Sequence, residues 1–313
     1  MIYWVRHRTT YTYESEVGYA RCVLRLTPPS NGRQTVLEHA IAITPEPSDT
    51  LVRDGPFGEA TRTVVIGTPH RKLVVEATSW VDVDAPPTEP EGGPPWEEVR
   101  ERAFRSAALD ASGPAPYLYP TPRTPIAADI TAYARRSFAA GRPILEAAEE
   151  LMERLHHDFT YDAKATTVRS TAAQAFEARR GVCQDFAHVM IAGLRGLGLP
   201  AGYVSGYLRT TPPPGRPRLQ GADATHAWVT LWCGDGWAGF DPTNAVREQN
   251  HHVCLATGRD YGDVAPIDGI TLSPGEQALK VEVDVIPADE LGAEPVGRPV
   301  VTQLAARRPV RTP

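Results

Sequence analysis

The sequence predicts an α+β protein in which an antiparallel β-sandwich precedes a domain of helices packed on an antiparallel sheet. Residues 1–83 contain a succession of short strand-like segments separated by turn residues, a spacing typical of a sandwich. Residues 85–125 are dense in proline and glycine, which indicates a domain boundary. Beyond residue 126 the helical patterns come first and the strand patterns follow, an order that favours α+β over a doubly wound sheet.

These patterns divide the chain into four parts. We predict a β-sandwich domain over 1–84, a Pro/Gly-rich linker with a short helix over 85–125, a second domain over 126–288 and a C-terminal tail over 289–313. In the first part, aromatic and β-branched residues predict strands at 4–13, 20–26, 38–43, 62–66 and 73–83. In the rest, apolar periodicity and capping signals predict helices at 96–109, 144–159, 171–178 and from 183 onward, and strands at 201–208, 227–232, 237–240 and 279–286.

Composition and charge exclude several classes of protein. Hydrophobic residues make up 42% and charged residues 22%, as in ordinary soluble globular proteins. The formal net charge of -6 argues against a nucleic-acid binder, which usually has a basic face. We expect no membrane partner, because no apolar run has the length of a membrane span. The four cysteines form no paired spacing and no signal peptide is recognisable, so we expect reduced thiols and a cytoplasmic location.

Cys183 lies where a helix is predicted to begin. Apolar residues recur after it at intervals of three and four, and Gly198 with Pro200 marks the end of the helix. Free backbone N–H groups and the helix dipole in a first turn favour a thiolate, which a nucleophilic cysteine needs. Free cysteines are nevertheless more often buried apolar residues, so position alone does not establish this role.

A predicted hairpin supplies the partners that such a cysteine needs. His226 begins one strand and Asp241 ends the next, so antiparallel pairing brings the two residues close together. An imidazole takes the thiol proton and later protonates the leaving amine, and a carboxylate fixes the tautomer and orientation of that imidazole. The backbone N–H of Cys183 is a candidate donor to the oxyanion of the tetrahedral intermediate. We therefore predict a Cys183, His226 and Asp241 triad.

At these residues the sequence resembles the bacterial transglutaminase-like proteins. The resemblance rests on 181–188 (GVCQDFAH), 200–207 (PAGYVSGY), 225–229 (THAWV), 239–244 (GFDPTN) and 258–264 (GRDYGDV), and on 54–59 (DGPFGE) with Pro69-His70 in the N-terminal part. It implies a papain-like cysteine core, a catalytic domain over 126–288, Cys183 as nucleophile, His226 as base and Asp241 as orienting residue, with no metal or organic cofactor. Glu59 occupies a position that is often asparagine in the family, which affects nothing in the triad.

Several other residues allow two interpretations. Tyr161 is either a phenol donor to the oxyanion or a packed strand residue, and Gln184 is grouped with it as an oxyanion or supporting residue. Asn244 belongs to the same group of oxyanion or supporting residues, although a role in the turn after Asp241 explains it better. His188 is better explained by packing or hydrogen bonding. The histidine pairs 156–157 and 251–252 lack the spacing of a zinc site, so we predict no metal.

The predicted function is a cysteine-dependent amide or peptide bond hydrolase, or an acyl transferase, working through a thioester on Cys183. The expected partner is a peptide or protein that supplies the amide, and the oligomeric state stays open. The alternative is a binding or scaffold module that recognises peptides without turnover. Removal of a glycan from an asparagine amide is a further possibility, because related folds perform it. The proline-rich loop 210–218 would serve as a substrate lid or as a docking segment.

Overall fold

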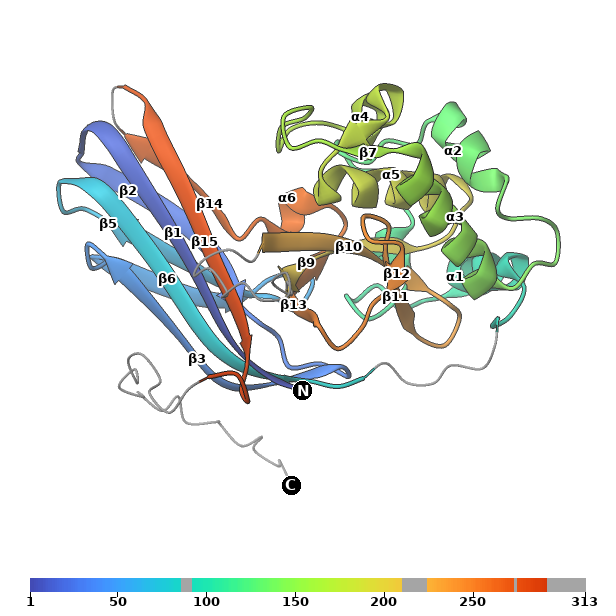
Figure 1. Cartoon of the computed structure of the whole chain (residues 1–313), viewed down its shortest axis with the longest axis horizontal. Coiled ribbons are helices and arrows are strands. Elements are labelled where there is room, and N and C mark those ends of the chain that lie inside the picture. Colours follow the sequence, from blue (N-terminus) through green and yellow to red (C-terminus); the bar gives the residue numbers. More distant parts are fainter. Residues whose placement is uncertain (86–91, 210–223, 273–274, 292–313) are drawn as a thin grey trace.

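A computed structural model describes residues 1–85, 92–209, 224–272 and 275–291. Figure 1 shows two units side by side, a β-sandwich and a unit in which helices cover a sheet. The loop 210–218 and the part of the tail beyond residue 291 lie outside the described residues, and the predictions for them are untested. Among the helices that the structure describes, none is both long and apolar enough to cross a membrane.

The sandwich consists of two four-stranded antiparallel sheets. One sheet has the order β15-β1-β6-β3, and the other has the order β14-β2-β5-β4. Along β6, alternate residues are buried, as expected where one face of a strand covers a core. The strands are β1 (Ile2–Val17), β2 (Tyr19–Thr27), β3 (Gln34–Thr44), β4 (Asp49–Asp54), β5 (Ala60–Ile66), β6 (His70–Val83), β14 (Ile267–Leu272) and β15 (Gln277–Pro287).

The assignment of residues 126–288 to a single second domain is wrong for the last two strands. The chain returns to the sandwich, where β14 pairs with β2 and β15 pairs with β1. Val283 and Val285 of β15 are buried in the sandwich core, and the buried Asp284 binds Arg6 of β1 at 2.7 Å. The alternating pattern of residues 279–286 correctly predicts a half-buried strand, but it contains no information about which sheet the strand joins.

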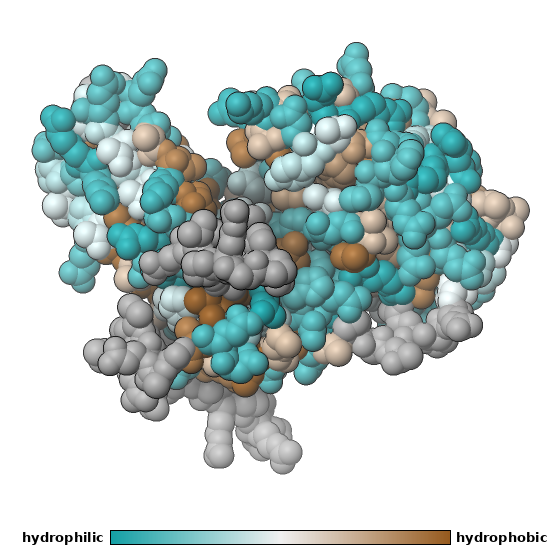
Figure 2. Space-filling model, viewed as in Figure 1, coloured by the Kyte–Doolittle hydropathy of each residue, from teal (hydrophilic) through white to brown (hydrophobic). Residues whose placement is uncertain are grey.

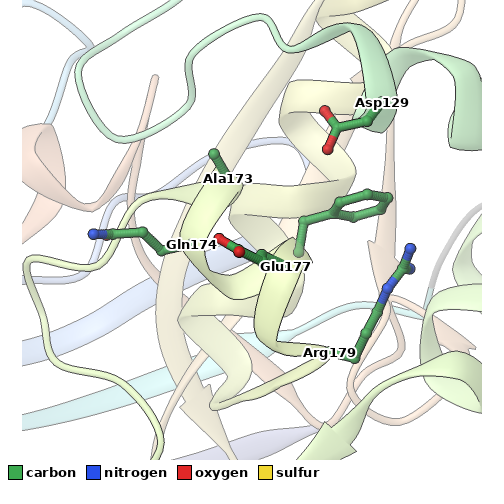
Figure 3. Close-up of a pocket in the computed structure, with 6 residues that line it drawn as sticks. Asp129, Ala173, Gln174, Glu177 and Arg179 are labelled. Atoms are coloured by element: carbon green, nitrogen blue, oxygen red, sulfur yellow. The ribbon is translucent and has the colours of Figure 1, made fainter.

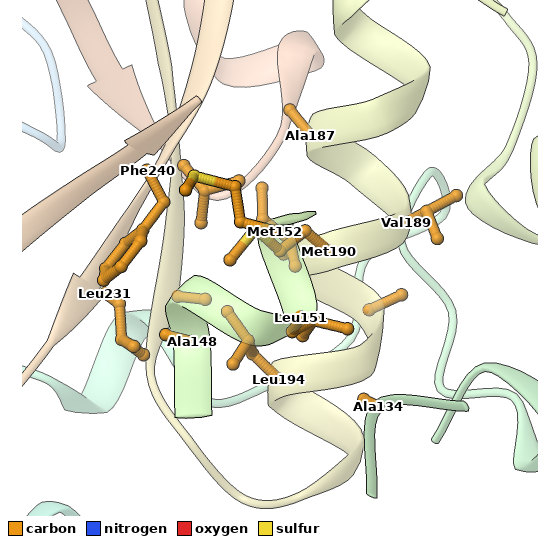
Figure 4. Close-up of a cluster of buried hydrophobic side chains, with 14 of the residues drawn as sticks. Ala134, Ala148, Leu151, Met152, Ala187, Val189, Met190, Leu194, Leu231 and Phe240 are labelled. Carbon is orange, nitrogen blue, oxygen red and sulfur yellow. The ribbon is translucent and has the colours of Figure 1, made fainter. Parts of the chain in front are cut away.

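The second unit is a five-stranded antiparallel sheet covered by helices. The sheet has the order β12-β11-β10-β9-β13, and α5 packs against β10 and β9 as well as against α2, α3 and α4. Figure 4 shows side chains of α5 and α3 meeting Leu231 and Phe240 of the sheet. The elements are α1 (Trp96–Arg105), α2 (Ala128–Arg135), α3 (Ile144–Asp158), β7 (Thr160–Tyr161), α4 (Ala172–Ala178), β8 (Arg180–Gly181), α5 (Cys183–Gly196), β9 (Ala201–Leu208), β10 (Ala224–Trp232), β11 (Trp237–Asp241), β12 (Val246–Arg247), β13 (His252–Gly258) and α6 (Tyr261–Val264).

The region 85–125 is more than a linker. Its predicted helix is present as α1, but Trp96, Val99 and Ala103 are buried in the same core as α3 and α5. The proline-rich connection that follows contains a 3-10 turn at Ala115–Tyr117, and Tyr117 is buried against Trp237 of β11. Proline and glycine content therefore locates the change of domain but not the residue at which packing begins.

Hydrogen bonds fasten the sandwich to the edge strand β13. Gln34 of β3 is buried, and its side-chain amide donates to the carbonyl of Cys254 at 2.8 Å and accepts from the N–H of Cys254 at 2.9 Å. His7 of β1 shares a hydrogen bond of 3.0 Å with the Tyr207 hydroxyl of β9. Figure 2 shows an indentation of the surface between the two units, with hydrophobic residues gathered on the sandwich side. The hydrogen bonds of Gln34 and His7 are thus specific polar contacts between the two units.

We expect Gln34→Leu to lower the free energy of unfolding by about 2–4 kcal/mol, because it leaves two buried backbone groups of Cys254 without partners. Urea unfolding followed by fluorescence measures this loss. The matched control is Gln277→Leu at an exposed position of β15. Equal losses in the two variants would show that the Gln34 contact does not stabilise the junction.

Candidate active site

Cys183 is the first residue of α5, as the sequence predicts. The Asp185 side chain accepts hydrogen bonds from the N–H of Val182 at 2.8 Å and from the Thr166 hydroxyl at 2.6 Å, so it stabilises the start of the helix. Gly181 permits this arrangement, because a Cβ atom there would lie 2.4 Å from Asp185 Oδ2. The thiol of Cys183 is partly exposed at a helix N-terminus, where anions are stabilised.

The hairpin of β10 and β11 brings His226 and Asp241 together. The two strands pair from Trp232 with Trp237 to Val229 with Phe240, so the start of β10 lies beside the end of β11. Nε2 of His226 lies 2.7 Å from Oδ2 of Asp241, and both side chains are buried. The structure therefore places these two residues as the hairpin pattern predicts.

His226 also interacts with Cys183. Burial on its own would lower the pKa of His226, but the hydrogen bond to Asp241 and the side chain of Cys183 outweigh it and raise that pKa well above its usual value. Because Asp241 occupies Nε2, the ring nitrogen left for the thiol is Nδ1. A protonated imidazole between a thiol and a carboxylate is the arrangement that stabilises a thiolate.

Among the residues that the structure describes, five hydrogen-bond donors hold the Asp241 carboxylate. Oδ1 accepts from the N–H groups of Thr243 at 3.0 Å and Asn244 at 3.2 Å, and Oδ2 accepts from the Asn244 side chain at 2.7 Å in addition to the two histidines His226 and His252. Burial would raise the pKa of Asp241, but hydrogen bonds from His226, His252 and Asn244 hold it well below its usual range. Asp241 is therefore a fixed, ionised acceptor.

Asn244 makes the turn contact and also supports the Asp241 carboxylate, the two roles between which its sequence left a choice. Its backbone N–H does bond back to Asp241, which is the expected turn contact. Its side-chain amide also binds Oδ2 of Asp241 and lies 3.4 Å from Nε2 of His226. Asn244 thus belongs to the hydrogen-bond network around the carboxylate.

Tyr161 and Gln184 lie near Cys183. Tyr161 pairs with Gly181 in the short parallel ladder of β7 and β8, and it is 60% exposed, which rules out the packed-core interpretation. Partial burial of the phenol and, to a smaller extent, the nearby Cys183 raise the pKa of Tyr161, so the hydroxyl keeps its proton and can donate. The Gln184 amide donates to the carbonyl of Val168 at 3.3 Å, so it holds a neighbouring loop.

His252 is a member of the site that the sequence analysis missed. It begins β13, a strand that was not predicted, and its Nε2 lies 3.2 Å from Oδ2 of Asp241. Its other ring nitrogen, Nδ1, accepts the N–H of Gln249 at 3.1 Å. The apolar run after His252 was the signal that could have revealed the strand.

His226, Asp241 and His252 are buried and offer donor atoms within 4.8 Å of one another, as a metal site would. In this arrangement, however, Nδ1 of His252 accepts a backbone N–H, so Nε2 of the neutral ring carries the proton. A protonated nitrogen has no lone pair for a metal ion. Hydrogen bonding therefore accounts for the spacing of these three side chains.

His188 has the packed and hydrogen-bonded role that the sequence predicts. It is fully buried, and its Nε2 accepts the N–H of Tyr261 at 3.2 Å. Burial lowers the pKa of His188 to about 3, so the ring is neutral. It is therefore a structural contact between α5 and α6.

A surface pocket lies at α2 and α4 (Figure 3). Its lining includes Asp129, Gln174, Glu177 and Arg179 and none of the triad residues. The guanidinium of Arg179 lies over the Phe176 ring at 3.9 Å, which is a packing contact. The candidate site is therefore placed at Cys183, beside the histidine that is bonded to Asp241.

Comparisons with known proteins agree with this architecture. The description "bacterial transglutaminase-like N-terminal region" matches residues 3–82, and "transglutaminase-like superfamily" matches residues 131–242. An uncharacterized protein of Mycobacterium tuberculosis is 39% identical over 298 residues, covering 91% of this chain and 92% of the relative. Part of a protein-glutamine gamma-glutamyltransferase of Pseudomonas aeruginosa is 34% identical over 126 residues, covering 37% of this chain and 19% of that protein.

A solved structure has the same fold over nearly the whole chain. It is a candidate cysteine protease from Cytophaga hutchinsonii, with a TM-score of 0.70, 21% sequence identity and coverage of 92% of both chains. The superfamily match spans the positions of Cys183, His226 and Asp241, and the N-terminal match spans most of the sandwich. The chain therefore belongs to the bacterial transglutaminase-like proteins of the transglutaminase-like superfamily.

Proposed function

We propose that this protein is a cysteine-dependent enzyme that breaks an amide bond of a peptide or protein through a thioester on Cys183. The observation that carries the proposal is the position of His226 between the Cys183 thiol and the Asp241 carboxylate. Cys183 is then the nucleophile, His226 the general base and acid, and Asp241 the residue that fixes the orientation of His226.

The reaction follows from these contacts. His226 takes the thiol proton, and the sulfur of Cys183 attacks the carbonyl carbon to form a tetrahedral oxyanion. The imidazolium then donates its proton to the nitrogen of the amide as the C–N bond breaks, which releases an amine and leaves a thioester. Water or a second amine attacks the thioester, His226 accepts the proton of that nucleophile, and the thiol is restored.

Two groups beside Cys183 suit the oxyanion. The backbone N–H of Cys183 belongs to the first turn of α5, where N–H groups have no acceptor within the helix. The Tyr161 phenol is exposed, keeps its proton and lies close enough to Cys183 for the two to interact electrostatically. Removing one donor of this kind costs about 3–4 kcal/mol of transition-state stabilisation.

The acceptor of the acyl group is either water or an amine. Water would make the protein a protease or amidase, and an amine would make it a cross-linking acyl transferase. The local likeness to the Pseudomonas protein-glutamine gamma-glutamyltransferase supports acyl transfer as one of these outcomes. The residues around the thioester serve both reactions equally, since His226 activates either nucleophile.

Alkylation by iodoacetamide near pH 6 tests the proposed pair. Because the pKa of His226 is raised, its imidazolium persists through the neutral range and is lost only as the pH rises to alkaline values. We expect Cys183 to react about 100-fold faster near pH 6 than Cys233, which is also partly exposed, since an ordinary thiol has a pKa of about 8.5. Peptide mapping by mass spectrometry gives both rates. Equal rates would refute the ion pair and favour the alternative of a binding module without turnover.

A further inference from the structure

His252 contributes a third side-chain contact to the Asp241 carboxylate. The residue is buried at the start of β13, and the bond from its Nε2 to Oδ2 of Asp241 is 3.2 Å long. The N–H of Gln249 points at Nδ1, which fixes the tautomer in which Nε2 carries the proton and donates. His252 is thus a neutral donor aimed at the atom that also binds His226.

The surroundings of His252 leave its ring little freedom. Its ring centroid lies 5.1 Å from that of the fully buried Trp228, at an interplanar angle of 72°. Trp228 also stacks on His226, with the two ring centroids 6.2 Å apart. Gly206 of β9 makes room for Trp228, since a Cβ atom there would lie 2.5 Å from the indole ring. Trp228 therefore packs against both histidines that bind Asp241.

The strand that carries His252 pairs with β9 and also has contacts from outside the catalytic sheet. Two residues along β13, the backbone of Cys254 makes both of its hydrogen bonds with the buried amide of Gln34 from the sandwich. Arg33, next to Gln34, also forms an ion pair of 3.6 Å with the largely buried Glu248. β13 is therefore held on one side by its pairing with β9 and on the other by the sandwich, and both contacts contribute to the position of His252.

We propose that His252 is a positioning residue, which holds Asp241 and through it His226 in the orientation that the reaction at Cys183 requires. The inference rests on the proposed function, because its effect is exerted on the Cys183 and His226 pair. Without His252, Oδ2 keeps only the donors from Asn244 and His226, so the carboxylate is held less firmly about its Cβ–Cγ bond and the imidazole bound to it is oriented less firmly as well. The sandwich would accordingly act on catalysis through one strand and one hydrogen bond.

Two isosteric variants separate positioning from packing. His252→Gln places an amide nitrogen near the position of Nε2 and keeps the donor to Asp241. In His252→Asn, the shorter side chain reaches only as far as the position of Nδ1. The variant therefore keeps a partner for the N–H of Gln249 and loses the donor to Asp241. The readout is the rate of Cys183 alkylation by iodoacetamide near pH 6 divided by the rate near pH 9, with thermal melting measured on the same samples.

We expect His252→Asn to lower this ratio about tenfold, by analogy with the loss of outer hydrogen-bond partners in metal sites, and His252→Gln to keep it within about twofold. An unchanged ratio in His252→Asn, or an equal fall in both variants, would overturn the positioning role. One equivalent of zinc in the wild-type protein, lost from both variants, would replace it with a metal site. A wild-type ratio like that of an ordinary thiol would refute the proposed function itself, and the inference with it.

Discussion

Replacing Cys183 with alanine is expected to lower turnover of an amide substrate by about 10⁶-fold, because the variant has no atom that can form the thioester. The same variant should lose the initial burst of nitrophenol released from p-nitrophenyl acetate, an activated ester that acylates nucleophilic thiolates. The burst amplitude, followed by absorbance, measures the number of reactive thiols per chain.

The control for this variant is Cys233→Ala, which removes the other partly exposed cysteine. We expect Cys233→Ala to keep the full burst, and both variants to unfold at the wild-type urea concentration within the error of the measurement. A burst that survives in Cys183→Ala and disappears in Cys233→Ala would show that Cys233, and not Cys183, is the nucleophile.

Asp241→Asn is expected to reduce kcat by about 10⁴-fold. Both oxygens of Asp241 accept hydrogen bonds, so an amide NH₂ in place of either oxygen faces a donor instead of accepting from it. The variant also removes the charge that raises the pKa of His226, so His226 loses its proton at lower pH than in the wild type. Steady-state kinetics across the neutral pH range measure both effects.

The matched control is Asp235→Asn, the same chemical change on an aspartate whose side chain is 89% exposed. We expect it to leave kcat within about twofold, since surface substitutions away from a site have small effects. A kcat for Asp241→Asn within tenfold of the wild type would contradict the role of Asp241 in orienting His226.

The sequence was most informative where short-range patterns coincide with the site. The spacing of apolar residues after Cys183 predicts the face that α5 buries, and the turn between residues 232 and 237 predicts a hairpin with His226 and Asp241 at its open end. The Thr171 to Gln174 capping box is present at the start of α4. Each of these features depends on neighbours within about 15 residues, which a single sequence contains.

The features that were missed depend on contacts distant in sequence. The partners of β14 and β15 lie more than 240 residues away along the chain in β2 and β1, and no local pattern specifies them. His252 looked like half of a histidine pair, because its role arises only when β13 joins β9 and brings the ring to Asp241. Substrate, partners and cellular location stay predictions, since they depend on molecules outside the chain.

The most direct test of the account is the intact mass of the protein after rapid acid quenching from a mixture of peptides. One peptide set contains glutamine side chains, and the matched set has glutamate in their place. We predict a single acyl adduct located on Cys183, released by neutral hydroxylamine as a thioester should be and absent from Cys183→Ala. The mass of the adduct identifies the amide that is attacked. Product formed without any adduct on Cys183, or an adduct that persists in Cys183→Ala, would contradict the thioester mechanism.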